Sequence, residues 1–429
     1  MKSSLISAVL LSLFLTPFSI AAPPSNGTDG PDTDRRNSVG AAFTMTNQES
    51  GNHLVVLSIS KTGQLSFDRA IPTGGRGARG MLAPIGDSIF SQGSMQIHYG
   101  QEMLVHTNPG SSTLSVWHVD PKNPLNIRRI GQPVPSGGDF PNSVTFNKAG
   151  DRLCALNTGT RNGFMCFMVD KEKGLTPLPA TFRPTNINQT IPATGPQNSV
   201  GHIKFSPNED QLYVTYKGFD QINTSGFLAR WNIDLDCPNS IAIAEANDQI
   251  FTDTVGLRPF GMTLIPGRNA VLTADPITGF DIFDLDKHTS KSTHIPNQGA
   301  HCWSMYSQKT GNYYLADADG ASLTEISIDT KAENLTGVIE ARYPKIPGSF
   351  LADPDLVDIK DKQYIMTLAP GALSIYVDEL RGPKDAHQIQ RFDLSVVNRR
   401  ANIPIDKNHT NGFITYLSDS VRTTSPCPL

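Results

Sequence analysis

Four titratable residues in the middle of the chain have the chemistry to hold and transform a small organic anion. Arg258 offers a planar fork for a carboxylate, and Lys217 offers a point charge. His202 titrates near neutrality and can move a proton, and Asp275 can act as a base or orient a partner. Closing a lactone needs a carboxylate held against a double bond and an acid that protonates carbon. Opening a lactone needs a base that activates water and donors for the developing oxyanion.

A repeated pattern of short strands predicts how these residues are positioned. Residues 137–179 contain four alternating apolar runs separated by turn clusters, which predict antiparallel strands joined by tight hairpins. Further copies begin near Gln92, Asn198, Arg258 and Ala300, with fainter copies at Phe43 and Phe350. About seven units with a period of roughly 40–60 residues predict an all-β fold, a seven-bladed β-propeller of four-stranded antiparallel blades. The strand near Ala42 is expected to help close the ring.

The blade geometry predicts a site at one mouth of the central channel. In an antiparallel blade the first strand starts at the end of the sheet where the second strand finishes. First-strand starts supply Gln92, Asn142, His202, Arg258, His301 and Asp353. Second-strand ends supply Asn108, Asn157, Lys217, Asp275 and Asp317. A concave surface where side chains from several strands converge is the default place to expect a binding or active site.

We therefore predict catalytic residues at His202, Arg258 and Asp275, and substrate-binding residues at Lys217, His301 and Gln92. Each also has a plainer interpretation as a capping, packing or turn residue; Asp275, for example, precedes a proline in a turn, where Asp is favoured.

The N-terminal segment predicts secretion. Residues 1–21 combine Lys2, an apolar run and the small residues Ser19 and Ala21, which is typical of a signal peptide cleaved near Ala21. Residues 22–38 are rich in Pro, Gly, Asp and Ser and are expected to be a disordered leader. Residues 39–429 are expected to form the single propeller, without a membrane span. We expect a monomer that is extracellular or cell wall-associated.

In a secreted protein the cysteines can form disulfides and the N-x-S/T sequences can carry glycans. Cys154 and Cys166 flank a predicted turn almost symmetrically, so they either form a disulfide or pack as small apolar residues. No partner can be assigned to Cys237, Cys302 and Cys427. Five asparagines are predicted to carry glycans: Asn26, Asn188, Asn223, Asn334 and Asn408.

The charge distribution and the spacing of Cys and His residues indicate neither a nucleic-acid partner nor a metal site. The formal net charge is -4, and the basic residues form only short clusters without interleaved aromatic residues. Such clusters indicate solvated surface, so no nucleic-acid partner is expected. No Cys or His spacing resembles a zinc site, and we expect no metal and no cofactor. The predicted partner is a small anionic molecule or a surface ligand.

Several phrases of the sequence resemble one family. They are IPTGGRG (71–77), SQGS (91–94), VPSGGDFPNSV (134–144), GLTPLP (174–179), KFSPNEDQLYVTYKG (204–218) and the pair Cys302-Trp303. They are similar to the lactonase-type seven-bladed propellers, which include 3-carboxy-cis,cis-muconate lactonizing enzyme and a bacterial 6-phosphogluconolactonase. Secreted fungal members are called 3-carboxymuconate cyclase-like. The resemblance spans residues 40 to 420 and implies the fold, whereas activity must be argued from the site.

Two departures from the family pattern keep two functions open. Related enzymes often carry an Arg-His pair at this blade entry, whereas Arg258 is followed here by Pro259 and Phe260. The family often has Glu at the position of Asp275. One hypothesis is a secreted lactonase or cycloisomerase, an isomerase of the 3-carboxymuconate cyclase type, that acts on a small anionic lactone or muconate-type acid at the channel mouth. The other is a non-catalytic secreted glycoprotein, a surface antigen or adhesion protein, that binds a ligand through the same mouth.

Overall fold

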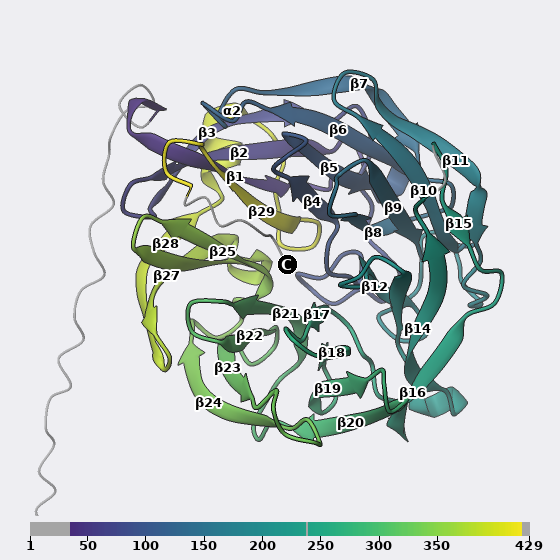
Figure 1. Cartoon of the computed structure of the whole chain (residues 1–429). Coiled ribbons are helices and arrows are strands. Elements are labelled where there is room, and N and C mark those ends of the chain that lie inside the picture. The colour runs from purple at the N-terminus through teal and green to yellow at the C-terminus, as the bar shows by residue number, and fades with distance from the viewer. Residues whose placement is uncertain (1–34, 237–238, 423–429) are drawn as a thin grey trace, which may run out of the picture.

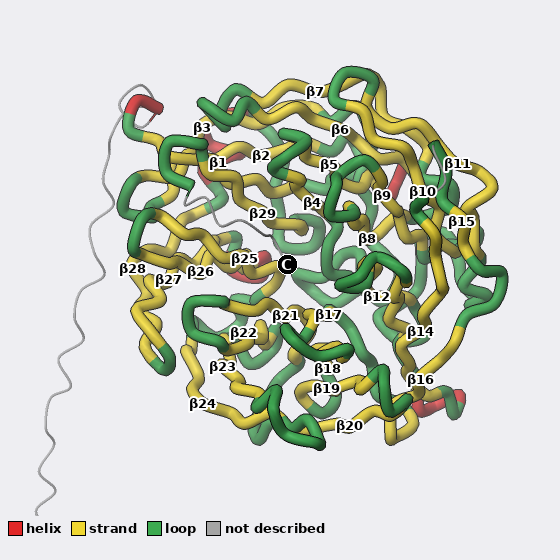
Figure 2. The backbone as a smooth tube through the Cα atoms, in the orientation of Figure 1, coloured by secondary structure: helices red, strands yellow, loops and turns green. Residues whose placement is uncertain are grey.

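Seven antiparallel sheets surround a central axis in the computed structural model, which describes residues 35–236 and 239–422 (Figure 1). The strands are joined mostly by turns and loops (Figure 2). The helical elements are short: α2 (Val396–Ala401), η1 (Pro109–Ser111), η2 (Asp220–Ile222) and η3 (Pro370–Ala372). The predicted all-β, seven-bladed propeller is confirmed.

In each blade four strands follow one another from the axis outward. Blade 1 contains β29 (Asn411–Leu417), β1 (Ser38–Met45), β2 (His53–Ser60) and β3 (Leu65–Pro72). Blade 2 contains β4 (Met95–His98), β5 (Met103–Asn108), β6 (Thr113–Val119) and β7 (Ile127–Pro135). Blade 3 contains β8 (Pro141–Phe146), β9 (Arg152–Asn157), β10 (Gly163–Asp170) and β11 (Gly174–Arg183).

The remaining four blades follow in chain order. Blade 4 contains β12 (Val200–Phe205), β13 (Gln211–Tyr216), β14 (Ser225–Asp234) and β16 (Asp248–Val255), with the short β15 (Ala242–Ile243) also paired to β14. Blade 5 contains β17 (Met262–Leu264), β18 (Ala270–Asp275), β19 (Gly279–Asp284) and β20 (Thr289–His294). Blade 6 contains β21 (His301–Ser307), β22 (Asn312–Asp317), β23 (Ser322–Ile328) and β24 (Gly337–Pro344). Blade 7 contains β25 (Ala352–Ile359), β26 (Lys362–Ala369), β27 (Ser374–Gly382) and β28 (Asp385–Asp393).

Blade 1 closes the ring with strands from both ends of the chain. Ala42 of β1 pairs with Thr415 of β29, so the strand near Ala42 takes part in closure as expected. The innermost position belongs to β29, which lies beside β1 (Figure 1). Two aspartate side chains of blade 7 hold β29 in place: Asp353 accepts the N–H of Gly412 at 3.0 Å, and Asp355 accepts the N–H of Thr415 at 2.8 Å. The closing strand is therefore attached on both of its edges.

Burial is greatest in the second strand of each blade, because neighbouring blades cover both of its faces, and it is lower in the innermost strands that border the channel and in the outermost strands. β9 and β22 are buried at every position, whereas β20 and β24 are mostly half-buried or exposed. Side chains that alternate along a strand point to opposite faces, so each blade packs against both neighbours. In one such interface Val105 of blade 2 lies in the same apolar cluster as Val144 and Leu153 of blade 3.

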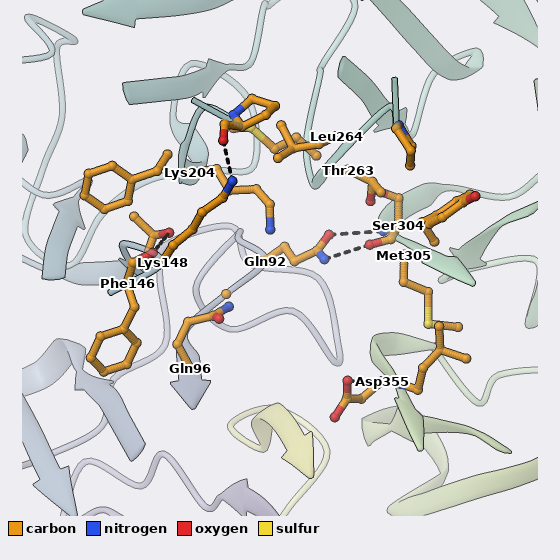
Figure 3. A pocket seen from close by; sticks show the side chains of 18 of the residues that line it. Gln92, Gln96, Phe146, Lys148, Lys204, Thr263, Leu264, Ser304, Met305 and Asp355 are labelled. Carbon is orange, nitrogen blue, oxygen red and sulfur yellow. Dashed lines mark hydrogen bonds between the residues drawn. The ribbon is translucent and has the colours of Figure 1, made fainter. Parts of the chain in front are cut away.

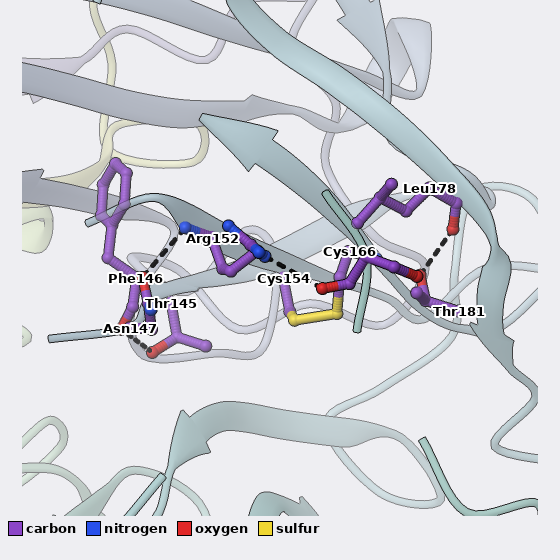
Figure 4. The surroundings of a disulfide bond; sticks show 9 residues. Thr145, Phe146, Asn147, Arg152, Cys154, Cys166, Leu178 and Thr181 are labelled. Atoms are coloured by element: carbon purple, nitrogen blue, oxygen red, sulfur yellow. Dashed lines mark hydrogen bonds between the residues drawn. A yellow bond between two sulfur atoms is a disulfide. The ribbon is translucent and has the colours of Figure 1, made fainter. Parts of the chain in front are cut away.

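Cys154 and Cys166 form a disulfide between directly opposed positions of β9 and β10, with their Cα atoms 4.0 Å apart (Figure 4). Cys302 is buried as a free thiol. Cys237 and Cys427 lie outside the described residues, as do the predicted signal peptide, most of the predicted leader and Asn26. Of the other predicted glycan sites, Asn188, Asn223 and Asn334 are exposed, and Asn408 is partly exposed. No helix in the described ranges is long and apolar enough to cross a membrane.

Candidate functional site

The two ends of the central channel differ in what covers them. Starts of inner strands pair with ends of second strands, as in Pro141 with Asn157 and His301 with Asp317. The predicted geometry of this end is therefore correct. We call it the cap end, because residues 76–94, the cap segment, run across it. The other end, where inner strands finish, is called the open end.

The cap segment crosses the axis and bonds to several blades. The N–H of Gln92 donates to the carbonyl of Gly201 in blade 4 at 3.1 Å, and its carbonyl accepts the Ser143 hydroxyl of blade 3 at 2.8 Å. The indole N–H of Trp303 in blade 6 donates to the carbonyl of Ser91 at 3.1 Å. Phe90 packs with apolar side chains of the cap and neighbouring loops. The predicted mouth is thus covered by the chain itself.

Lys217 lies beneath the cap and anchors it. Its Nζ donates to the carbonyl of Phe90 at 2.5 Å, to the Ser199 hydroxyl at 3.0 Å and to the carbonyl of Val200 at 3.1 Å. The same nitrogen lies 4.4 Å from the ring centroid of Phe260. Burial lowers the pKa of Lys217 and raises the pKa of Asp87, and the attraction between their charges opposes both shifts. Lys217 is therefore a fully engaged cation of the cap end.

The two predicted histidines are enclosed. His202 is 2% exposed, and its Nδ1 accepts the backbone N–H of Met262 at 3.0 Å. Burial and the nearby charge of Lys204 lower the pKa of His202 well below its usual value. In His301, Nδ1 lies 2.7 Å from Gln298 Oε1 and Nε2 lies 2.8 Å from the Thr324 hydroxyl. Both rings are held as neutral hydrogen-bonding groups between strands.

Arg258 and Asp275 lie next to each other at the entry of blade 5. The backbone N–H of Arg258 donates to Asp275 Oδ2, and Oδ1 of the same carboxylate accepts the N–H of Ile277 at 2.8 Å. The Arg258 side chain is half-buried, and its Nε has no hydrogen-bond partner among the described residues. Arg258 also interacts electrostatically with Lys217. Lys217, Arg258 and Asp275 therefore lie near one another where blades 4 and 5 meet. His301 lies apart from them, at the start of β21 in blade 6.

A large cavity occupies the central channel and opens at the open end. Its volume is about 1560 Å³, and innermost strands of all seven blades line it. Gln92 is the one residue of the predicted set that lines it; His202, Arg258, Asp275, Lys217 and His301 do not. The Gln92 amide forms the floor, because Nε2 donates to the carbonyl of Ser304 at 2.8 Å and Oε1 accepts its N–H at 3.0 Å (Figure 3).

Side chains from the innermost strands line this cavity, among them Gln96, Thr145, Lys204, Thr263, Met305 and Asp355. Lys204 is the cation among these six residues, and it points into the pocket (Figure 3). Its Nζ has no hydrogen-bond or ion-pair partner in residues 35–236 and 239–422. Burial lowers the pKa of Lys204, and no carboxylate in the described part of the chain offsets this effect.

Several carboxylates also line the cavity, and three of them are on β25: Asp353, Asp355 and Asp358. Burial raises the pKa of Asp353 to about 8 and also raises the pKa of Asp355. Asp355 Oδ2 accepts two hydrogen bonds from Thr415, and Oδ1 accepts the N–H of Leu356 at 3.0 Å. A cation and an acid with unusual pKa values thus share one cavity, which is typical of functional sites.

Sequence reasoning missed Lys204, although the sequence contains a signal for it. Ile203 and Phe205 pack together in the blade 3–4 interface. Since side chains alternate along a strand, Lys204 between them must face away from that interface. A lysine on a strand with apolar neighbours on both sides was therefore a candidate for the channel.

Comparison with solved structures identifies the same architecture. A "putative 6-phosphogluconolactonase" from Bacteroides uniformis matches with a TM-score of 0.58 and 13% identity, covering 88% of this chain and 100% of that one. One from Bacteroides fragilis matches with a TM-score of 0.60 and 11% identity, covering 88% and 98%. A functionally unknown protein from Desulfotomaculum acetoxidans matches with a TM-score of 0.55 and 13% identity, covering 88% and 99%.

No family model matches the sequence, and no curated protein sequence matches it. At 11–13% identity the structural likeness establishes the fold alone. The assignment to a secreted fungal branch stays a prediction. The resemblance to the lactonase-type seven-bladed propellers is confirmed at the level of the fold, which this chain shares over most of its length with two proteins described as a "putative 6-phosphogluconolactonase".

Proposed function

We propose that this protein binds a small organic anion in the central channel and acts there on a lactone or a muconate-type acid. The observation that carries the proposal is Lys204, a cation without a partner among the described residues, which faces a cavity of about 1560 Å³. Lys204 is half-buried, and an anionic ligand would supply the partner that its ammonium lacks. The resemblance to lactonase-type propellers supports a lactone as the reacting group.

Asp355 is the group we assign as general base for hydrolysis. It would take a proton from water as the water attacks the lactone carbonyl, and Lys204 would stabilise the oxyanion that forms. Collapse of that intermediate breaks the ring C–O bond, and the proton passes to the leaving oxygen. Burial raises the pKa of Asp355, which makes it a stronger base than an ordinary carboxylate.

Binding without turnover is the second candidate, and the cap end favours it. His202, the predicted proton-transfer group, is enclosed and its Nδ1 is occupied by the Met262 N–H. Both oxygens of Asp355 also accept hydrogen bonds. In this alternative the protein is a secreted glycoprotein that carries a ligand or displays a surface, and the channel binds but does not convert its anion.

A panel of lactones and muconates, with paired lysine variants, tests the proposal. Lys204→Met removes the channel cation, and Lys148→Met is the matched control because Lys148 is an exposed residue at the rim, where its Nζ donates to the carbonyl of Pro207 at 2.6 Å. We expect Lys204→Met to lose about 10- to 100-fold in affinity and Lys148→Met to bind like wild type.

Asp355→Asn separates the two candidates. Retained binding with turnover lowered by about 10²–10⁴-fold supports catalysis. If wild type binds an anion through Lys204 but converts none of the panel, the binding protein is the correct interpretation. If Lys204→Met binds the panel as wild type does while the protein stays folded, the channel is not the site.

Secretion, glycosylation and a monomeric state remain proposals. Glycosylation is supported by three exposed sequon asparagines, Asn188, Asn223 and Asn334, and secretion by the disulfide between Cys154 and Cys166. Such a protein would meet its ligand outside the cell or in the cell wall. Size-exclusion chromatography with light scattering tests the monomer.

A further inference from the structure

The side chain of Lys204 is held where a small molecule can reach its amine. Its backbone lies in β12, directly opposite Tyr213 of β13, so its Cα atom is fixed within blade 4. The side chain is half-buried and points into the central cavity of about 1560 Å³ (Figure 3). A ligand that enters the channel therefore meets the Nζ atom directly.

Four lysines in the described part of the chain have a shifted pKa, and Lys204 differs from the other three. Lys362 and Lys384 are exposed, and a glutamate beside each raises its pKa. Lys217 has a pKa lowered by burial, but its Nζ makes three hydrogen bonds beneath the cap. Lys204 combines a pKa lowered by burial with an amine that faces a cavity and has no partner among the described residues.

Other charged side chains near Lys204 leave its amine unaffected. Six of them, all from blades 3 to 5, line the same cavity, and each has a hydrogen-bond or ion-pair partner of its own; Arg230, for example, pairs with Asp248. On β12 itself, His202 is enclosed and neutral, and in blade 7 the Asp355 carboxylate is bonded to β29. Burial is the one cause of the lowered pKa of Lys204, so none of these groups offsets it. The six side chains are Lys148, Glu209, Asp210, Arg230, Arg268 and Asp286.

An amine of this kind is suited to attack a carbonyl group. A neutral amine has a lone pair for the attack, whereas an ammonium has none. Each unit by which the pKa of a lysine is lowered raises the neutral fraction at neutral pH about tenfold. Desolvated lysines in pockets are accordingly the ones that form imines with carbonyl substrates. An anion in the channel favours the ammonium and a neutral carbonyl compound does not, so the two uses of Lys204 belong to different ligands.

We propose that Lys204 is a nucleophilic amine that forms an imine with a small aldehyde or ketone in the channel. Nζ attacks the carbonyl carbon, the C=O π electrons move to the oxygen, and one N–H proton passes to that oxygen to give a carbinolamine. The C–O bond then breaks as the nitrogen lone pair forms C=N, and the hydroxide takes the second N–H proton and departs as water. The inference goes beyond the proposed function, because the bond is covalent and requires no anionic group.

Reductive trapping tests the inference on the folded, full-length mature protein. Glycolaldehyde and cyanoborohydride are added at pH 7, and hydride adds to the carbon of the protonated imine to leave a stable secondary amine. Peptide mass spectrometry gives the rate of modification at each lysine. We expect Lys204 to be modified several-fold faster than the exposed Lys61 and Lys122. In urea, where burial is lost, the three rates should converge.

A matched pair of variants shows which amine carries the fast reaction. Lys204→Met should remove the fast component of glycolaldehyde incorporation, and Lys148→Met should keep it. Modification of Lys204 no faster than that of Lys61 and Lys122 would overturn the inference, and so would a preference for Lys204 that persists in urea. Either result leaves the anion-binding tests of the proposed function intact. Fast trapping at Lys204 in a protein that binds none of the lactone and muconate panel would support the imine and refute the anion site.

Discussion

The two ends of the channel contain similar charged residues but differ in what those residues touch. At the cap end, Lys217 makes three hydrogen bonds and faces the Asp87 carboxylate. In the open channel, Lys204 makes none within the described residues and faces the cavity. Both lysines have a pKa lowered by burial. A lowered pKa is therefore common to a lysine that is fully hydrogen-bonded and to one without a described partner, so it does not by itself identify a binding site.

The comparison also explains why the predicted catalytic set is enclosed. Around the axis, backbone N–H groups of inner strands face the next blade and need acceptors. His202 supplies one for Met262, Ser143 supplies one for Ile203, and Asp353 supplies one for Gly412. Polar residues at the starts of inner strands can therefore be explained by hydrogen bonds between neighbouring blades. They resemble active-site residues because accepting a hydrogen bond from a buried backbone N–H requires the same oxygen and nitrogen atoms that bind a ligand.

The largest effect should come from the cap end. Lys217→Met leaves Asp87 buried without its cation, which typically costs about 3–5 kcal/mol of unfolding free energy. Urea denaturation monitored by circular dichroism measures it. The double variant Lys217→Met with Asp87→Asn should recover part of the loss, because no unpaired charge remains. An unfolding free energy of Lys217→Met equal to wild type would show that Lys217 does not hold the cap.

The matching substitution in the open channel should separate binding from stability. Lys204→Met removes a desolvated charge that no described carboxylate offsets, so we expect no loss of unfolding free energy. The affinity for an anion that the lactone and muconate panel selects should fall by about 10- to 100-fold, equivalent to about 1.4–2.7 kcal/mol. Thermal denaturation and calorimetry on the same preparation give both quantities. A variant that is strongly destabilised yet binds normally would reverse the roles assigned to the two lysines.

A third measurement uses pH to examine the joint between blades 7 and 1. The pKa of Asp353 is raised to about 8, above its value of about 4 in an unfolded chain. The neutral carboxyl therefore favours the folded state, and stability from this group is complete below about pH 4. That stability is lost as pH rises toward 8, with a slope of at most about 1.4 kcal/mol per pH unit.

Asp353→Asn should flatten this dependence, since an amide does not titrate. Unfolding free energies between pH 5 and 9 for both proteins isolate the contribution as their difference. Asp358→Asn is a suitable control, because Asp358 is an exposed residue of the same strand. Parallel curves for wild type and Asp353→Asn would mean that Asp353 titrates normally.

The smallest effect on stability is expected for the glycan sites. Asn188→Gln and Asn223→Gln alter exposed side chains, and such changes usually stay within about 0.5 kcal/mol. Each should nevertheless lower the intact mass of protein from a glycosylating host by one glycan. The mature chain should start near Ala22. A wild-type mass that equals the bare polypeptide and includes Met1 would contradict both expectations.

Much of the fold could be predicted from the sequence because each blade is built from residues that are close together in the chain. Alternating apolar runs and turn clusters recur in each blade, and the predicted unit starts at Gln92, Asn198 and Phe350 precede β4, β12 and β25 by a few residues. The hairpin that joins Cys154 to Cys166 is equally local, since directly opposed positions follow from the turn between them. The sequence also shows Lys204 between the apolar residues Ile203 and Phe205. This alternation indicates that Lys204 faces the channel only once the position of the propeller axis is known.

The strands, their turns, the number of blades and the end of the sheet at which inner strands begin all follow from the amino-acid pattern. Which mouth of the channel is covered, and which lysine faces the cavity, depends on the assembled ring. Residues 76–94 cross the axis through bonds to blades 3, 4 and 6, and β29 closes blade 1 through contacts with the opposite end of the chain. Such contacts join residues far apart in sequence, and no local periodicity encodes them. Whether a charge is satisfied depends on atoms from several blades, so it is decided only when the ring has closed.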